Sequence, residues 1–169
     1  FHRGLAAMKQ HPFNTSRRLT GKGQYIVEPY QPEAIKIGVS SCLLGENVRF
    51  DSGHKKNAYI TGVLFNYFEF QPFCPEVAIG LGTPRVSIRL VAAGDKIRCQ
   101  GTKNTDLDFT ERLDQVAENK RNWHDDLCGY ILKRDSPSCG MERVKIYTNG
   151  MPIKKGHGVY AKRMMANFP

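Results

Sequence analysis

Residues 34–45 read AIKIGVSSCLLG, and this stretch decides the expected fold. Apolar and polar residues alternate from Ala34 to Ser40, which is typical of a β-strand. The strand runs directly into a turn-like segment that holds Cys42. In open α/β sheets, ligands bind outside the carboxyl ends of the strands. The stretch therefore predicts a first strand that delivers Cys42 to a ligand-binding edge.

Strand-like and helix-like segments alternate along most of the remaining chain. Further strands are expected over residues 70–73, 86–92, 96–100, 129–133 and 144–147, and helices over 57–69, 110–123 and 159–167. Two tight turns are expected, at Gly94-Asp95 and at Asn149-Gly150. This alternation favours an α/β fold, a single Rossmann-like domain with a mostly parallel sheet flanked by helices.

The length of 169 residues suits one domain of ordinary size, which we expect over residues 34–169. Residues 1–33 are expected to form a basic N-terminal extension and linker. Residues 1–23 carry five Lys or Arg side chains and no acidic one. Such a leader is typical of a transit peptide, a nucleic-acid arm, vector-derived sequence or a disordered tail, and these alternatives stay open.

The net charge of +9 favours a polyanionic partner, because cations that displace counterions from phosphates give affinity without sequence readout. No apolar run of eighteen residues exists, so no membrane span is expected. The leader lacks an apolar secretory core, and we expect a cytoplasmic protein.

Five cysteines cannot all pair, and a reducing cytosol keeps most of them as thiols. Cys42, Cys74 and Cys139 each follow a predicted strand and lie in a turn that contains Gly or Pro. Parallel neighbouring strands would bring the three thiols to one edge, either as a shared metal site or as separate structural thiols. No CxxC pair indicates a zinc ribbon. Cys99 and Cys128 are expected to pack as small hydrophobic residues.

Four segments carry a resemblance to a known family. They are SSCLLG (40–45), VRFDSGHK (48–55), CPEVAIGLGTPR (74–85) and LKRDSPSCGMERVK (132–145). These segments resemble the signature of the thiouracil desulfidase (TudS-like) family, and the resemblance covers roughly residues 35–165 and not residues 1–30.

The resemblance implies an α/β domain in which Cys42, Cys74 and Cys139 hold a 4Fe-4S cluster, with one open iron that has no protein ligand. Members of the family remove sulfur from thiolated uracil without net redox chemistry. One branch carries a second, C-terminal domain and converts 4-thiouridine to uridine in tRNA. GENVRFDSGHK and GVYAKRMMANFP resemble that branch, so a C-terminal partner domain absent from this chain is expected.

Hydrolytic removal of sulfur needs groups that move protons. Glu76, two residues after Cys74, is the leading candidate, and capping of a following helix is the alternative. Ser136 and Ser138 are further candidates for catalysis, and they also suit a simple turn. Candidates for substrate binding are Asp51, His54, Lys55 and Arg85, with Arg49 and Arg89 as possible phosphate contacts.

The expected function is a non-redox desulfidase that acts on 4-thiouridine in tRNA. One alternative is a desulfidase of free thiouracil or 4-thiouridine monophosphate. The other is a non-catalytic RNA-binding module stabilised by a structural metal.

Overall fold

The computed structural model describes residues 17–19, 25–27 and 34–169. The chain divides into two units, Phe1–Ala34 and Ile35–Pro169, and each is described by itself. In the first unit, strands β1 (Arg17–Leu19) and β2 (Tyr25–Val27) pair antiparallel. No strand is predicted there, because three residues are too few to show an alternation. The remainder of the expected extension lies outside the described residues.

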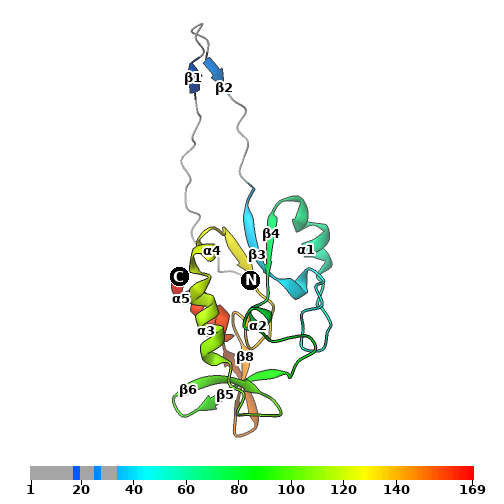
Figure 1. The fold of residues 1–169 in the computed structure, drawn as a ribbon, viewed down its shortest axis with the longest axis vertical. Helices are drawn as coiled ribbons and strands as arrows, with labels where there is room; N and C mark the ends of the chain where they lie inside the picture. Colours follow the sequence, from blue (N-terminus) through cyan, green and yellow to red (C-terminus); the bar gives the residue numbers. More distant parts are fainter. Residues whose placement is uncertain (1–16, 20–24, 28–33) are drawn as a thin grey trace. The chain divides into compact units, whose positions relative to one another are not determined.

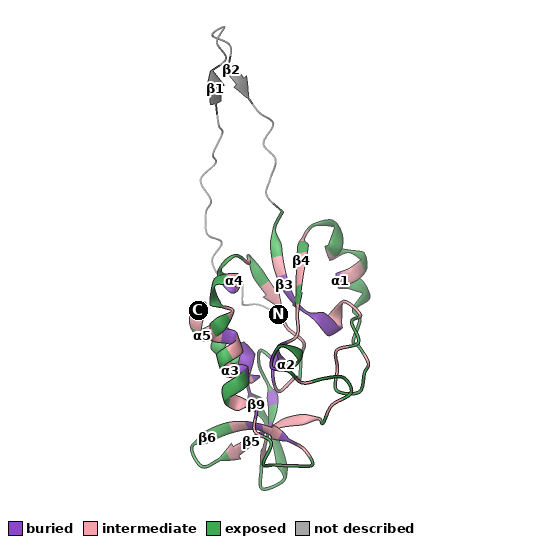
Figure 2. Cartoon of the chain, in the orientation of Figure 1, coloured by how far each residue is buried: buried purple, intermediate pink, exposed green. Residues whose placement is uncertain are grey.

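The second unit contains a three-stranded parallel sheet in the order β4-β3-β7 (Figure 1). Strand β3 (Lys36–Ser40) lies between β4 (Glu69–Phe73) and β7 (Gly129–Ile131). Figure 2 shows that β3 passes from exposed at its start to buried at its carboxyl end. The predicted first strand is confirmed, and its carboxyl end lies inside the domain.

Gly38 leaves room on the face of the sheet for a side chain of the neighbouring strand β7. Its register partner on β7 is Tyr130, whose ring lies over the glycine. A Cβ atom at Gly38 would lie 2.4 Å from Cδ2 of Tyr130, far inside van der Waals contact. The centre of the sheet therefore requires a residue without a side chain at this position.

The helix predicted over residues 57–69 is shorter in the structure. Helix α1 (Ala58–Gly62) begins at Asn57, whose side chain accepts two backbone N–H groups of the first turn. A 3₁₀ turn, η2 (Leu64–Asn66), follows it. Gly62 and the β-branched Val63 are poor helix formers, which accounts for the early end of α1.

A second sheet has the strand order β6-β5-β8-β9. Strands β5 (Ile88–Ala93) and β6 (Lys96–Gly101) form the predicted antiparallel hairpin. Strand β8 (Val144–Thr148) pairs parallel with β5 and antiparallel with β9 (Met151–Gly156). The turn between β8 and β9 lies at the predicted Asn149-Gly150, where both residues have positive φ.

Strand β9 was not predicted. Its residues are exposed up to Gly156, so the sequence MPIKKG shows no alternation of apolar and polar positions. It is an edge strand of the sheet and includes a proline, which edge strands tolerate.

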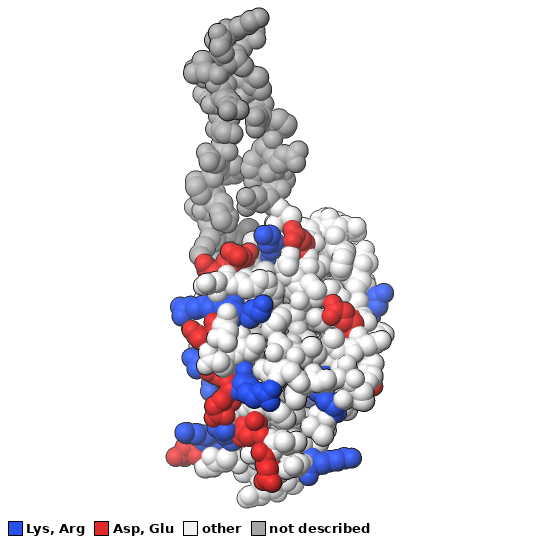
Figure 3. Space-filling view, viewed as in Figure 1, with Lys and Arg blue, Asp and Glu red and all other residues white. Residues whose placement is uncertain are grey.

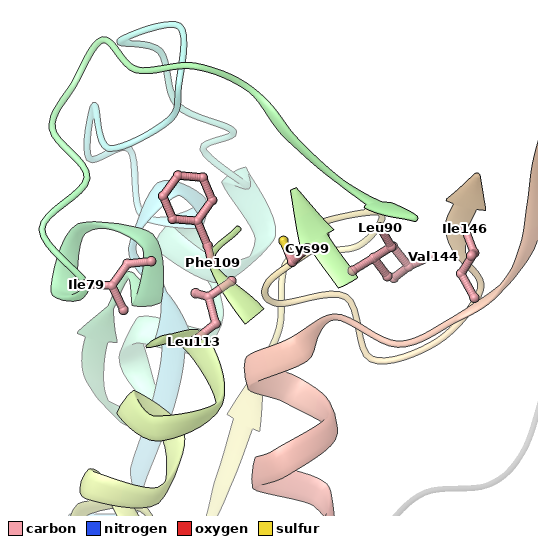
Figure 4. Packing of buried hydrophobic residues seen from close by; sticks show 7 residues of the cluster. All are labelled: Ile79, Leu90, Cys99, Phe109, Leu113, Val144 and Ile146. Carbon is pink, nitrogen blue, oxygen red and sulfur yellow. The ribbon is translucent and has the colours of Figure 1, made fainter. Parts of the chain in front are cut away.

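Four helices complete the unit: α2 (Pro75–Ala78), α3 (Thr110–Asn119), α4 (Arg121–Asp125) and α5 (Val159–Asn167). The helix predicted over residues 110–123 is divided into α3 and α4, and the predicted final helix is confirmed. Figure 4 shows the largest core cluster, in which Leu113 of α3 packs near Ile79 and Phe109, with Leu90, Cys99, Val144 and Ile146 from the second sheet. Burial of this apolar surface attaches the helices to the second sheet.

The α/β class, with a parallel sheet flanked by helices, is confirmed. The expectation of one sheet needs refinement, because the strands of the second unit form two. Only β4-β3-β7 is wholly parallel, whereas the second sheet contains two antiparallel pairs and one parallel pair. None of the helices among the described residues has both the length and the apolar character needed to cross a bilayer.

Candidate functional site

A cavity of about 260 Å³ lies at the carboxyl ends of β3 and β4. Cys42, Cys74 and Cys139 all line it. Cys42 lies in the 3₁₀ turn η1 (Ser41–Leu43), which directly follows β3, and Cys74 directly follows β4. Cys139 lies in the loop between β7 and β8. The parallel sheet therefore brings the three predicted cysteines to one cavity.

Cys74 is held at the start of α2. It is the N-cap residue, and the buried Pro75 occupies the first helical position. Proline suits that position because its fixed φ angle matches the helix and its missing N–H group would have had no partner. The sequence Cys-Pro-Glu therefore turns the chain sharply into the cavity and sets Glu76 beside Cys74.

The loop that carries Cys139 is fixed by hydrogen bonds and by close packing. Ser136 Oγ accepts the backbone N–H groups of Ser138 at 3.3 Å and Cys139 at 3.1 Å. Gly140 packs so tightly that a Cβ atom there would lie 2.3 Å from Cγ2 of Val144. The backbone N–H of Gly158 donates to the Gly140 carbonyl at 2.7 Å. The position of Cys139 is therefore set by both the turn and the start of α5.

Burial controls the protonation of the three thiols. It raises the pKa of Cys42, and the neighbouring Cys74 raises it further. Burial also raises the pKa of Cys74, while the backbone N–H of Val77 offsets part of that rise. Burial, followed by the charge of Glu76, raises the pKa of Cys139 to about 12. The thiols alone are therefore protonated at neutral pH, and a bound metal centre would favour the thiolates by its own charge.

The donor set fits an iron–sulfur cluster better than a single ion. Among the described residues, no three His, Cys, Asp or Glu side chains meet closely enough to hold one metal ion. A 4Fe-4S cluster places its protein ligands on different irons, with cysteine sulfurs about 6–7 Å apart. Three free thiols line one cavity, and thiolate is the ligand that such clusters use. The Ser138 hydroxyl oxygen lies 3.6 Å from Cys139 Sγ, and polar groups close to the sulfurs also suit a bound cluster.

Glu76 forms a largely buried ion pair within the cavity. Its Oε2 accepts hydrogen bonds from Nη2 of Arg85 at 2.7 Å and from Nε of Arg85 at 3.0 Å. The Arg85 side chain is only 6% exposed and also donates to the carbonyl oxygens of Val48 and Gly82. Arg85 was a predicted substrate contact, and the structure shows that its guanidinium holds Glu76 and two loops.

The second oxygen of Glu76 faces Ser138. Ser138 Oγ donates to Glu76 Oε1 at 2.6 Å and lies 3.0 Å from Ser136 Oγ. Because a carboxylate oxygen can accept more than one hydrogen bond, Oε1 keeps capacity for a proton from another donor. The three predicted catalytic residues therefore lie in one hydrogen-bonded chain beside Cys139.

Comparison with known proteins agrees with this arrangement. The family described as 2-thiouracil desulfurase matches residues 37–169. The chain belongs to the 2-thiouracil desulfurase family. A solved structure, a [4Fe-4S]-dependent thiouracil desulfidase named TudS, is 30% identical with a TM-score of 0.59, and the match covers 79% of this chain and 86% of that chain. No curated protein matches the chain.

In this desulfurase-family chain, two further cations line the cavity, Arg49 and Lys133. Burial lowers the pKa of Lys133, and the nearby charge of Arg49 lowers it further. The Arg49 guanidinium pairs with the half-exposed Asp51 at 3.2 Å. Two cations that repel each other at the wall of a cavity suit an anionic group of a ligand. Sequence reasoning missed Lys133, although it lies in the LKRDSPSCG segment.

Three predicted substrate contacts lie outside the cavity. Asp51 accepts hydrogen bonds from Arg49 and from the backbone N–H of Gly53. His54 Nδ1 accepts the backbone N–H of Lys56 at 3.1 Å, and the backbone N–H of Lys55 donates to the Cys42 carbonyl at 2.8 Å. These residues therefore organise the loop that follows Cys42, and contact with a substrate stays a prediction for each of them.

The other two cysteines differ from each other. Cys99 is fully buried in the core cluster of Figure 4, as predicted. Cys128 is exposed, so the prediction that it packs in the interior is wrong. It lies directly before β7, and its backbone N–H donates to the Lys36 carbonyl at 2.8 Å. The backbone of Cys128 thus extends the sheet pairing while its side chain faces outwards.

Proposed function

We propose that this chain is a non-redox desulfidase that removes sulfur from thiolated uracil, with 4-thiouridine in tRNA as its substrate. Cys42, Cys74 and Cys139 would hold a 4Fe-4S cluster with one iron open to substrate. The observation that carries the proposal is the meeting of these thiols with Glu76 in one cavity of a 2-thiouracil desulfurase family member. The [4Fe-4S] dependence of the related TudS structure supports it.

The open iron of a bound cluster would supply a Lewis acid with affinity for the sulfur of a thiocarbonyl group. The three cysteine sulfurs and the polar groups around them would hold that cluster in the cavity. The Ser138 hydroxyl, which donates to Glu76, lies 3.6 Å from Cys139 Sγ, and Ser136 Oγ accepts the backbone N–H groups of Ser138 and Cys139. This arrangement keeps the Cys139 sulfur in position.

Glu76 would move the proton of the attacking water. Water adds to the ring carbon that carries sulfur, Oε1 of Glu76 accepts a proton from it, and the sulfur leaves as hydrosulfide. Carbonyl oxygen thus replaces sulfur, and no electron is gained or lost. Arg85 orients the carboxylate through Oε2, which leaves Oε1 and its partner Ser138 on the reactive side. Ser138 is 1% exposed, so we assign it the positioning of Glu76 and Cys139.

Arg49 and Lys133 support a nucleotide substrate. They place two positive charges at the cavity wall, where a phosphate of thiouridine would offset their mutual repulsion. Free thiouracil lacks that phosphate. Asp51, His54 and Lys55 lie in the neighbouring exposed loop, where we expect contact with more distant parts of a tRNA. The five free thiols suit the reducing cytoplasm in which we place the enzyme.

Among the described residues, the face of the protein drawn in Figure 3 offers no basic patch suited to RNA. Figure 3 shows basic and acidic side chains interspersed over α3 and the β5–β6 hairpin. Ion pairs of 2.7 Å join Arg98 to Asp108 and Arg163 to Asp114. Positive charge on this face is therefore neutralised locally, as Arg49 is by Asp51, whereas Lys133 at the cavity forms no ion pair with a described residue and is better suited to RNA.

The test uses anaerobically reconstituted protein with three substrates: thiolated tRNA, 4-thiouridine monophosphate and 2-thiouracil. Loss of the thiocarbonyl absorbance measures turnover, and a broad band near 400 nm, roughly, reports the cluster. Turnover of thiolated tRNA supports the full proposal. Turnover of only the small substrates would retain a desulfidase and remove tRNA. A colourless zinc protein without turnover would favour a structural RNA-binding module instead.

A further inference from the structure

A second hollow, of about 400 Å³, adjoins the cysteine cavity. Phe50, Arg85 and Ser87 line both. The residues that line only this outer hollow are Pro84, Val86, Thr102 and Lys103. Because three residues line both, the outer hollow lies next to the cysteine cavity, within reach of a ligand longer than one nucleotide.

The three residues that line both are held in place by the protein itself. The backbone N–H of Arg85 donates to the Phe50 carbonyl at 3.0 Å, which joins the loop after Cys42 to the loop before β5. The Arg49 guanidinium lies 5.4 Å from the centre of the Phe50 ring. The hydroxyls of Ser87 and Thr102 lie 2.6 Å apart. These contacts form the outer hollow before any ligand arrives, which lowers the entropic cost of binding.

The chemistry of the outer hollow matches that of a nucleotide. Phe50 and Val86 are each 41% exposed and offer apolar surface on which a base can stack. Lys103 is exposed, makes no ion pair with any described residue, and can contact a phosphate. The paired hydroxyls of Ser87 and Thr102 offer both a donor and an acceptor for a ribose hydroxyl.

The charge of the outer hollow also favours a polyanion. Its described lining contains two cations, Arg85 and Lys103, and no acidic side chain. The guanidinium of Arg85 is already occupied by Glu76 and two carbonyls, so Lys103 is the cation that remains for a ligand. A phosphodiester that leaves the cysteine cavity past Phe50 would meet Lys103 next.

We propose that the outer hollow binds the nucleotide adjacent to the thiolated nucleotide in an RNA strand. The base stacks on Phe50 and Val86, and its phosphate contacts Lys103. This inference rests on the proposed function, because it assumes that the thiolated base occupies the cysteine cavity. It adds a subsite that distinguishes a strand from a single nucleotide.

The experiment compares two substrates on the same reconstituted enzyme. One is 4-thiouridine 5′-monophosphate, which fills only the cysteine cavity, and the other is an RNA trinucleotide with 4-thiouridine in the middle. Two variants act on the outer hollow alone: Lys103→Gln removes its cation, and Val86→Glu adds a negative charge. Lys96→Gln is the matched control, because Lys96 is exposed at the other end of β6 and lines neither hollow.

Both variants should lower kcat/KM for the trinucleotide about fivefold or more, while kcat/KM for the monophosphate and the control variant stay unchanged. Lys103→Gln should also reduce by about one the slope of the logarithm of RNA affinity against the logarithm of salt concentration. That affinity is measured separately with a labelled, unthiolated RNA decamer. The subsite would be rejected if both variants had the wild-type kcat/KM for the trinucleotide. It would also be rejected if they lost kcat/KM equally on both substrates.

The binding measurement keeps the two proposals separate. If loaded enzyme converts none of the substrates, the proposed function fails, and the decamer affinities still decide whether the outer hollow contacts RNA. If the monophosphate is converted normally and neither variant changes decamer affinity, the desulfidase proposal stands and the subsite is rejected.

Discussion

Ser138 donates a hydrogen bond of 2.6 Å to Glu76, although 62 positions separate the two residues in the sequence. The contact joins helix α2 to the loop after β7. It also connects two of the three cysteine-bearing segments, because Glu76 follows Cys74 and Ser138 precedes Cys139. The same bond therefore orients a carboxylate and holds the cavity together.

Replacing Glu76 by Gln tests its role in proton transfer. The amide keeps an oxygen that can accept from Ser138 but cannot take a proton from water, so turnover should fall by about 10²–10⁴ while iron content stays normal. The buried Arg85 loses its counterion, which should lower the free energy of unfolding by about 2–4 kcal/mol. Turnover, iron content and melting temperature are measured on one preparation. Normal turnover would remove Glu76 from the mechanism.

The two serines should separate into different phenotypes. Ser138→Ala removes the donor to Glu76, so turnover should fall about tenfold with a stability loss of about 1 kcal/mol. Ser136→Ala instead leaves the backbone N–H groups of Ser138 and Cys139 without their acceptor. The protein should therefore retain less iron, while turnover per bound cluster stays close to that of wild type. Rates normalised to iron content distinguish these effects. Identical behaviour of both variants would contradict the assignment.

Cysteine variants test which thiols serve the cluster. Ala at Cys42, Cys74 or Cys139 should abolish both iron binding and turnover, because only two thiolates remain. Cys128→Ala is the matched control, since this thiol is exposed and outside the cavity. Cys99→Ala should keep iron and turnover but lower the free energy of unfolding by about 1–2 kcal/mol through a core cavity. Iron analysis, turnover and denaturant unfolding supply the readouts.

His124 should make the stability of the protein fall in acid. Burial, and then the charge of Lys120, lower its pKa from 6.5 to about 4, and its Nε2 lies 2.5 Å from the hydroxyl of Tyr160. Between about pH 6.5 and pH 4 the unfolded chain binds a proton that the folded chain does not, so the free energy of unfolding falls by up to about 3 kcal/mol.

The measurement is denaturant unfolding across that pH range. His124→Gln should flatten the dependence, because the side chain no longer titrates and an amide can still bond to Tyr160. His157→Gln serves as the control, since His157 is exposed. A wild-type curve that is flat between pH 6.5 and pH 4 would show that His124 accepts a proton in the folded state.

The parallel sheet and the cysteine grouping were predictable because both depend on short-range patterns. Alternation in AIKIGVS indicates β3, and a turn directly after a strand gives the position of Cys42. The position of the site at this edge of the sheet then follows from the rule that ligands bind at the carboxyl ends of parallel strands. The place of Glu76 in the cavity was predictable for the same reason, since it follows Cys74 by two residues, and its role in proton transfer stays a prediction.

The contacts that sequence reasoning missed depend on tertiary packing. Arg85 pairs with Glu76, nine positions earlier, across the loop that contains Pro84. No local sequence pattern indicates the direction of the Arg85 side chain. Lys133 reaches the cavity because β7, which ends two residues before it, pairs with β3. Its backbone N–H donates to Ser40 Oγ, 93 positions away in the sequence. Strand β9 was missed because an exposed edge strand has no apolar face for a periodicity to reveal.

The most direct measurement is a crystal structure of the anaerobically reconstituted protein, with anomalous scattering recorded at the iron edge. We predict one 4Fe-4S cluster in the cavity, bound by the sulfurs of Cys42, Cys74 and Cys139, with one iron that has no protein ligand and faces Glu76. A cluster on any other set of residues, or a map without an iron peak in a protein that turns over, would contradict it.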